Sequence, residues 1–412
     1  MALNSLIHSS CPVLYFFKKN IYFLALTIIV CCSSPLLAET WAEKTLAQMT
    51  LEEKLGQLFI APACPLAEET HWDNWVNVME TLHIGNVIAK QSTLRAHVQF
   101  LNRLQLKSTL PLLVTADAEW GLAMRIQDGM AFPKNRILGA MGDTDLIYRI
   151  GAEIARQAKR IGIHMNLAPV ADVDNCPGNP VIGIRSFGSD PVHVAACVSA
   201  FISGTQSQGV LACAKHFPGH GDTLIDSHKA LPLIPHTRER LDALELVPFR
   251  SAIESGVSAI MSGHLLVPSI DPDFPASLSH NALTGLLKNE LNFNGLIITD
   301  ALNMHALAGS PEEIALAAFE AGSDLLLYGA HLLPVVEELL TATIPRAHQA
   351  LKEAVLKGTI SLERLDQSVL KILSIKEQLG IHRKRIVSDE DLTESLYTQE
   401  TTDLYTIISG GT

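Results

Sequence analysis

The stretch Gly295-Leu296-Ile297-Ile298-Thr299-Asp300 is a short apolar run that ends in a carboxylate. Seven more runs of this kind recur along the 412-residue chain, at residues 56–61, 85–89, 111–117, 165–172, 210–216, 258–264 and 323–328. Their length and continuous hydrophobicity are typical of strands that are buried on both faces. The sequence therefore predicts a parallel sheet of eight strands.

Helical patterns lie between these runs, at residues 145–161, 190–208, 239–255 and 310–321. The second pattern begins Asp190-Pro191, a capping residue followed by proline at the first helical position. Strands that alternate with helices belong to the α/β class, and eight of them favour a (β/α)8 TIM barrel. A doubly wound sheet is the alternative, but no glycine-rich dinucleotide turn follows the first run. We expect one catalytic domain over residues 39–385 and a polar C-terminal tail over residues 386–412.

Composition excludes several classes of protein. Hydrophobic residues make up 48% of the chain and charged residues 18%, which excludes a disordered chain. The net charge of −12 argues against a nucleic-acid partner. The seven cysteines are scattered without a Cys-x-x-Cys pair, so neither a zinc knuckle nor a disulfide framework is indicated.

The first 38 residues follow a secretory pattern. Lys18 and Lys19 precede an apolar run over residues 21–32, and Ala38 offers a small residue for cleavage. We expect residues 1–38 to be a signal peptide, which makes the protein exported, either periplasmic or secreted. An uncleaved membrane anchor or a lipidated cysteine is the alternative.

Polar side chains collect at the ends of the predicted strands. Asp117, Asp172, His216, His264 and Asp300 each close an apolar run. The active sites of TIM barrels lie at the carboxyl ends of the strands, so these residues predict a site on that rim.

The densest polar segment follows the fifth run, at residues 215–228 (KHFPGHGDTLIDSH). It holds three His, two Asp and one Lys in 14 residues, with Pro and Gly that break any helix. It is therefore predicted to be a long loop on the active face. Its side chains could bind a metal, through His216, His220, Asp222, Asp226 and His228. Alternatively, the loop carries a proton donor over a substrate pocket.

This loop resembles the signature of glycoside hydrolase family 3, in its β-N-acetylglucosaminidase (β-hexosaminidase) branch. Residues 179–188 (NPVIGIRSFG) and 299–304 (TDALNM) match further motifs of that family, and the resemblance extends over about residues 46–380. It implies a retaining exo-β-N-acetylglucosaminidase. The substrates implied are peptidoglycan fragments or chitooligosaccharides.

The resemblance also implies residue roles. Asp300 matches the catalytic nucleophile, His228 the general acid/base and Asp226 its orienting partner. The residues that match the sugar-binding positions are Asp117, Arg125, Arg185, Lys215 and His216. It implies no cofactor and no metal, and we expect a monomer that contacts a membrane only through an anchor or lipid at its N-terminus.

The implied chemistry agrees with the residue types. An imidazole has an ordinary pKa near 6.5, so His228 can donate and retrieve a proton near neutral pH. Asp226, two residues earlier, is close enough to fix the tautomer of the ring. Such an acid/base places no second carboxylate against an incoming anion, so phosphate is a possible acceptor besides water.

Three alternatives remain open at this point. The first is a β-glucosidase of the same family, because Trp120 replaces the first glycine of the family's usual Asp-x-Glu-Gly-Gly motif. The second is a metal-dependent TIM-barrel hydrolase. The third is a sugar-binding barrel without catalysis.

Overall fold

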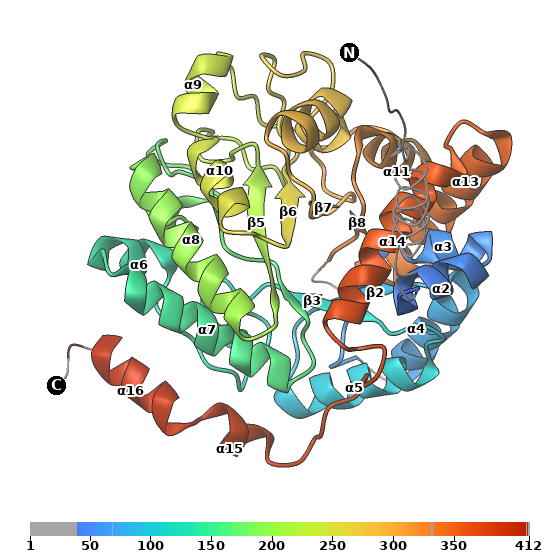
Figure 1. The fold of residues 1–412 in the computed structure, drawn as a ribbon, viewed down its shortest axis with the longest axis horizontal. Coiled ribbons are helices and arrows are strands. Elements are labelled where there is room, and N and C mark those ends of the chain that lie inside the picture. Colours follow the sequence, from blue (N-terminus) through green and yellow to red (C-terminus); the bar gives the residue numbers. More distant parts are fainter. Residues whose placement is uncertain (1–38, 68, 331–332, 409, 411–412) are drawn as a thin grey trace, which may run out of the picture.

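The computed structural model describes residues 39–408, except 68 and 331–332, together with residue 410. Eight parallel strands form one sheet in the order β7-β6-β5-β4-β3-β2-β1-β8. The strands are β1 (Phe59–Ala63), β2 (Asn86–Ala89), β3 (Leu113–Ala116), β4 (Met165–Asn166), β5 (Leu211–Phe217), β6 (Ala259–Ser262), β7 (Leu296–Thr299) and β8 (Leu326–Leu327). A parallel bridge between Ile298 and Leu325 joins the two ends of the sheet. The fold is therefore the predicted (β/α)8 barrel (Figure 1).

Each of the eight predicted runs overlaps one strand. β1 and β5 extend beyond their runs by two residues and one residue, and β4 and β8 are only two residues long. Leu167-Ala168-Pro169 follows β4, and the proline has no N–H to continue the ladder. The carbonyl groups of Ala168 and Pro169 still accept from Cys213 and Lys215 of β5, and Val170 bridges to Lys215. All strand residues are buried, as expected for a barrel covered by helices.

Helices and helical turns cover the barrel (Figure 1). The α-helices are α2 (Trp41–Gln48), α3 (Leu51–Gly56), α4 (Glu69–Leu82), α5 (Leu94–Lys107), α6 (Asn135–Met141), α7 (Thr144–Arg160), α8 (Pro191–Ser207), α9 (Arg238–Ala243), α10 (Val247–Glu254), α11 (Pro311–Ala321), α12 (Leu333–Glu338), α13 (Ile344–Lys357), α14 (Leu362–Gln378), α15 (Leu392–Leu396) and α16 (Gln399–Ile408). The 3₁₀-helices are η1 (Leu122–Met124), η2 (Gly183–Arg185) and η3 (Ala276–Leu278), and the π-helices are η4 (Asn281–Glu290) and η5 (Leu339–Thr343).

Three of the four predicted helices agree with the structure within about a residue at each end, namely α7, α8 and α11. The fourth, over residues 239–255, is wrong in one respect, because it consists of two helices, α9 and α10. Pro248 lies in the first turn of α10 and cannot accommodate a helical carbonyl at Leu244. The proline thus begins a new helix.

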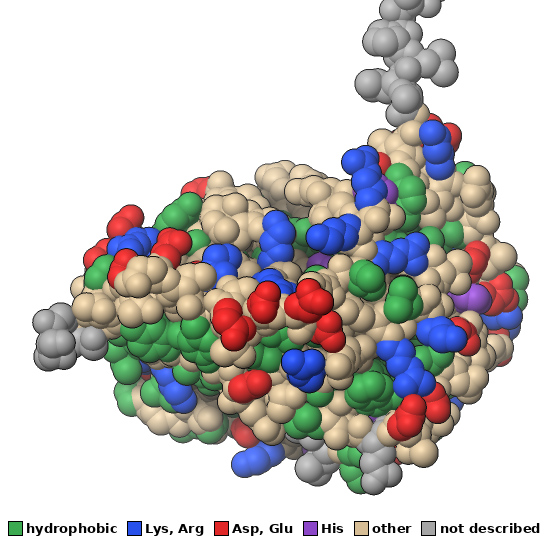
Figure 2. Space-filling view, turned by 90° about the horizontal axis from the view of Figure 1, so that it is seen from below, with side chains coloured by type: hydrophobic (Ala, Val, Ile, Leu, Met, Phe, Trp, Pro, Cys, Tyr) green, Lys and Arg blue, Asp and Glu red, His purple; other side chains and the backbone are tan. Residues whose placement is uncertain are grey.

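Residues after 386, expected as a polar tail, form α15 and α16 against the barrel. Leu392, Leu396 and Leu404 are buried. Thr401 Oγ1 donates to Glu153 of α7 over 2.6 Å. On the face that carries these helices, basic side chains are interspersed with acidic ones (Figure 2).

The predicted leader, residues 1–38, lies outside the described residues. Among the helices that the structure describes, none combines the length and the apolar character that a membrane span requires.

Candidate active site

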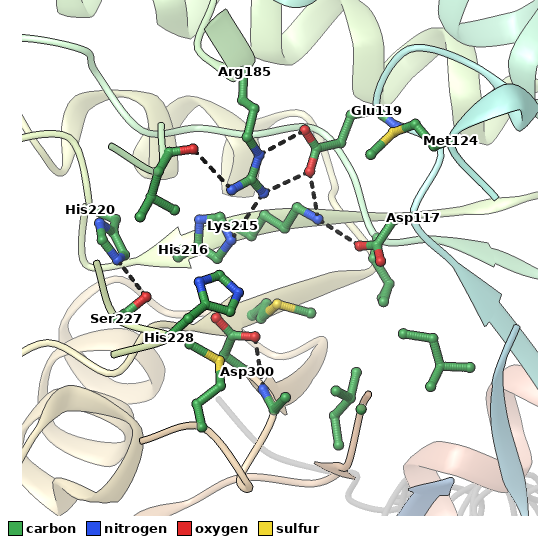
Figure 3. A pocket seen from close by; sticks show the side chains of 18 of the residues that line it. Asp117, Glu119, Met124, Arg185, Lys215, His216, His220, Ser227, His228 and Asp300 are labelled. Carbon is green, nitrogen blue, oxygen red and sulfur yellow. Dashed lines mark hydrogen bonds and ion pairs between the residues drawn. The ribbon is translucent and has the colours of Figure 1, made fainter. Parts of the chain in front are cut away.

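A cavity of about 270 Å³ opens at the carboxyl ends of the strands. Asp117 reaches it from the end of β3, Lys215 and His216 from β5, and Asp300 from the end of β7. His228 joins them from the loop after β5 (Figure 3). The position agrees with the rule that TIM-barrel sites lie on this face.

A network of carboxylates and cations forms one wall of the cavity (Figure 3). Lys215 Nζ donates to Asp117 Oδ1 and to Glu119 Oε1, each over 2.9 Å. Arg185 holds Glu119 in a bidentate pair of 3.0 and 2.7 Å. Arg125 Nη2 donates to the other oxygen of Asp117 over 2.6 Å. Both oxygens of each carboxylate are therefore committed to cations.

This pairing sets the charges of the wall. Burial alone would raise the pKa of both carboxyls. Lys215, Arg125 and Lys90 nevertheless hold the pKa of Asp117 well below its ordinary value. Arg185 and Lys215 likewise lower the pKa of Glu119 to about 2. Asp117 and Glu119 are therefore ionised at neutral pH. Their charge-assisted hydrogen bonds hold the three cations in place, so the remaining N–H groups of these cations point in fixed directions and can bind hydroxyl groups.

Asp300 is directed into the same cavity (Figure 3). Its Oδ1 accepts a hydrogen bond from the backbone N–H of Ala301 over 2.8 Å. Burial would raise the pKa of Asp300, but His216, His264 and this N–H hold it below its ordinary value. The carboxylate is therefore charged, and it forms no ion pair with a described residue. These are the properties that a nucleophile requires.

His228 and Asp226 form a dyad at the mouth of the cavity. His228 Nδ1 and Asp226 Oδ1 lie 2.8 Å apart, and the backbone N–H of His228 donates to the same oxygen over 2.9 Å. Burial would raise the pKa of Asp226, but these two contacts lower it. The His228 side chain is 63% exposed, so a departing group and solvent can both reach its ring.

The loop that carries the dyad is tied to its surroundings. Asn179 Nδ2 donates to the carbonyl oxygens of His220 and Gly221. Burial and the neighbouring His216 lower the pKa of His220 to about 4, so its ring is neutral. His220 Nε2 and Ser227 Oγ lie 2.9 Å apart, next to His228. These contacts hold the loop in place and so position His228 at the cavity.

Asp172, to which sequence reasoning gave no role, is fully buried beneath His216. It accepts from the His216 ring over 2.7 Å and from the backbone N–H of His220 over 2.7 Å. The other ring nitrogen of His216 lies 3.5 Å from Arg185. Asp172 therefore positions His216 without lining the cavity.

His264, another of the five strand-end residues, also lies behind the cavity. Its ring contacts Ser277 Oγ at 2.7 Å and the carbonyl of Ala301 at 3.0 Å. It supports the backbone next to Asp300.

All eight residues assigned from the resemblance are therefore placed. Six of them line the cavity: Asp117, Arg125, Arg185, Lys215, His216 and His228. Asp300 also lines it, and Asp226 contacts His228. Sequence reasoning missed two charged lining residues, Glu119 and Lys90. Lys90 follows the second apolar run directly, so the strand-end rule itself could have identified it.

Trp120 does not line the cavity. Its ring packs against Lys134, whose Nζ lies 4.6 Å from the ring centroid. The large side chain at this position therefore lies outside the sugar pocket, although its neighbour Glu119 is inside.

The residues of the metal alternative do not gather into one ligand set within the described part of the chain. Asp222 instead lies with His236 and Glu245. Arg240 donates to Glu245 over 2.5 Å and lies 3.6 Å from Asp222. The guanidinium of Arg240 thus already occupies the space beside both carboxylates.

Comparisons with known proteins identify the family of the chain. A model of the glycosyl hydrolase family 3 N-terminal domain matches residues 50–375. The chain is 32% identical over 355 residues to a β-N-acetylglucosaminidase/β-glucosidase of Cellulomonas fimi, covering 83% of this chain and 60% of that protein. It is 36% identical over 269 residues to a β-hexosaminidase of Idiomarina loihiensis, covering 63% of this chain and 80% of that protein.

The chain is also similar to solved structures, including one from the same family. A family 3 β-N-acetylglucosaminidase from Paenibacillus sp. superposes with a TM-score of 0.79 at 38% identity, covering 88% of this chain and 68% of that chain. A β-glucoside phosphorylase superposes with a TM-score of 0.79 at 27% identity, covering 90% and 65%. The chain spans 60% and 49% of the lengths of two of the curated relatives it matches.

Proposed function

Because the chain belongs to glycosyl hydrolase family 3, we propose that it is a retaining exo-β-N-acetylglucosaminidase. The observation that carries the proposal is the convergence of Asp300 and the Asp226–His228 dyad on one cavity. Relatives whose names include β-hexosaminidase and β-N-acetylglucosaminidase support the sugar. The size of the cavity, about 270 Å³, suits one terminal sugar unit.

The reaction we propose has two steps. Asp300 attacks the anomeric carbon while His228 protonates the departing oxygen, which gives a glycosyl ester on Asp300. His228 then takes a proton from the incoming water, which attacks the same carbon and restores Asp300. Asp226 holds the tautomer in which Nδ1 of His228 carries a proton, so that Nε2 faces the reacting oxygen.

Substrate binding rests on the wall of paired charges. Lys215, Arg185 and Arg125 present N–H groups that their carboxylate partners hold in fixed directions. Such donors need no reorganisation when the sugar binds, which favours catalysis. Asp117 contributes carboxylate oxygens that accept from hydroxyl groups. The sugar itself is uncharged in this proposal.

A second candidate is a β-glucosidase of the same family. It is favoured by the Cellulomonas fimi relative, whose name gives both activities. A phosphate acceptor in the second step is a related proposal, supported by the similarity to a β-glucoside phosphorylase. The exposed His228 leaves room for an anion at the mouth of the cavity.

The natural substrates we propose are peptidoglycan fragments or chitooligosaccharides, acted on by an exported, monomeric protein. Lys18, Lys19 and the apolar residues 21–32 support the export of the chain. Fractionation of cells, with N-terminal sequencing of the mature protein, tests this. A protein found in the cytoplasm with an intact leader contradicts it.

The test of function compares aryl β-N-acetylglucosaminide with aryl β-glucoside, with and without phosphate. The panel is the wild type, Asp300→Ala and His228→Ala. We expect cleavage of the N-acetyl substrate, lost in Asp300→Ala and strongly reduced in His228→Ala. Preference for the glucoside favours the second candidate, and acceleration by phosphate favours phosphorolysis. No cleavage of either glycoside contradicts the proposal.

A further inference from the structure

Lys90 is a lining residue that the mechanism above does not use. It follows β2 directly, and only 5% of the residue is exposed. Its backbone N–H donates to the carbonyl of Ala63. Its Nζ lies close to Gly329 at the end of β8, where an added Cβ would come within 3.2 Å of it. The ammonium group therefore fills space that a larger residue at position 329 would take.

Within the described part of the chain, Lys90 Nζ has no hydrogen-bond or ion-pair partner. The other three cations of the cavity, Arg125, Arg185 and Lys215, each have a carboxylate partner. Each carboxylate oxygen of Asp117 and Glu119 already accepts from at least one of those cations. Lys90 is thus a buried cation without a committed partner.

The charges that line the cavity do not cancel. Its four basic side chains are Lys90, Arg125, Arg185 and Lys215, and its three carboxylates are Asp117, Glu119 and Asp300. Removing an unpaired ammonium from water is unfavourable, and ionisable groups perturbed by burial inside a cavity cluster at functional sites. The surplus positive charge is therefore best accounted for by a negatively charged ligand group.

Lys90 also lies on a particular wall. β2 and β6 are four positions apart in the eight-stranded barrel, so they face each other across it. The segment that carries His228 runs along the β6 side, where Ile234 pairs with Leu266. The leaving group departs past His228. Lys90 therefore faces the ring of the terminal sugar on the wall opposite to the leaving group.

We propose that Lys90 is a specificity residue that binds an acidic substituent, a carboxylate or a sulfate ester, on the ring of the terminal sugar. The inference rests on the proposed function and deepens it, because the preferred sugar then carries a negative charge that a plain N-acetylglucosamine lacks.

The ionisation of Lys90 is consistent with this role. Burial lowers its pKa to about 8, opposed by Asp117 and reinforced by Arg125, with smaller contributions from Cys64 and Asp300. The group is mostly charged at pH 7 and loses its proton as the pH rises through about 8. Binding of an acidic sugar should therefore weaken above that pH, while the ligand's own charge stays constant.

The experiment measures kcat/KM for four aryl β-glycosides, those of N-acetylglucosamine, its 6-O-sulfate, its 3-O-carboxyethyl ether and glucuronic acid. The enzymes are the wild type, Lys90→Met, Lys90→Arg and, as a matched loss of charge outside the cavity, Lys159→Met. For at least one acidic glycoside, the ratio of its kcat/KM to that of the neutral glycoside should fall about tenfold or more in Lys90→Met. Lys90→Arg should keep most of the ratio, and Lys159→Met all of it.

A calorimetric titration adds a readout that does not depend on turnover. The free acidic sugar whose glycoside is preferred should bind the wild type more weakly at pH 9 than at pH 7, and this pH dependence should disappear in Lys90→Met.

Cleavage of the neutral glycoside with no cleavage of any acidic one overturns this inference and leaves the proposed function standing. The inference is also overturned, and the proposed function left standing, if the ratio of acidic to neutral kcat/KM is equal in the wild type and Lys90→Met. A wild type that cleaves none of the four glycosides overturns both.

Discussion

Glu119 is the residue whose replacement tests the paired-charge wall most sharply. Its side chain is 1% exposed and accepts three hydrogen bonds, two from Arg185 and one from Lys215. Glu119→Gln keeps the shape of the side chain and removes its charge. Because cations approach both carboxylate oxygens, either orientation of the new amide places its NH₂ group against a donor.

The structure allows the loss to be estimated. Removing one member of a buried ion pair costs about 3–5 kcal/mol. Lys215 keeps Asp117 as a partner, and the Arg185 side chain is 21% exposed, so the lower end applies. We expect the free energy of unfolding to fall by about 3 kcal/mol. With Arg185 and Lys215 no longer held in place, kcat/KM on aryl β-N-acetylglucosaminide should fall about a hundredfold.

Glu153→Gln is the matched control. Glu153 is a buried carboxylate on α7 that Arg156 holds in a bidentate pair of 2.7 and 2.7 Å, away from the cavity. Urea unfolding should show a comparable loss of stability in both variants, but only Glu119→Gln should lose kcat/KM. A Glu119→Gln variant that keeps kcat/KM within about threefold of the wild type would show that Glu119 does not position Arg185 and Lys215 for catalysis.

Three further predictions concern other parts of the molecule. Asp226→Asn should lower kcat about a hundredfold by releasing the His228 tautomer, while circular dichroism stays unchanged; a wild-type kcat would remove Asp226 from the dyad. Trp120→Leu should change the preference between N-acetylglucosaminide and glucoside less than about threefold, because the ring lies outside the cavity; a larger change in the ratio of kcat/KM would place it at the sugar. Burial lowers the pKa of Lys376 to about 7, so the unfolded chain binds more protons between about pH 7 and 10, and stability should rise with pH across that window. Urea unfolding from pH 6 to 9 should show a smaller rise in Lys376→Met, whereas equal slopes would refute the assignment.

The barrel and most of the site could be predicted from the sequence. Strands that are buried on both faces have continuous apolar sequences, so the sequence predicts how many strands there are and about where each one lies. The polar residue after each run located the rim, and Asp117, His216 and Asp300 are on it.

What could not be predicted depends on contacts between distant residues. Glu119 sits only two positions after Asp117, but its partner Arg185 is 66 residues away, and nothing local indicates that pair. Asp172 similarly acts through a residue 44 positions further on. The helices after residue 386 are short, and their buried face is explained only by the presence of α7.

The proposed mechanism depends most directly on a covalent bond between Asp300 and the sugar. Incubation with a 5-fluoro-N-acetylglucosaminyl fluoride, which slows the second step, followed by intact-mass and peptide analysis, tests it directly. We predict one added glycosyl group per chain, on the peptide that contains Asp300, and none in Asp300→Asn. A label on another residue, or turnover of the fluoride without any label and with inverted product, would contradict the account.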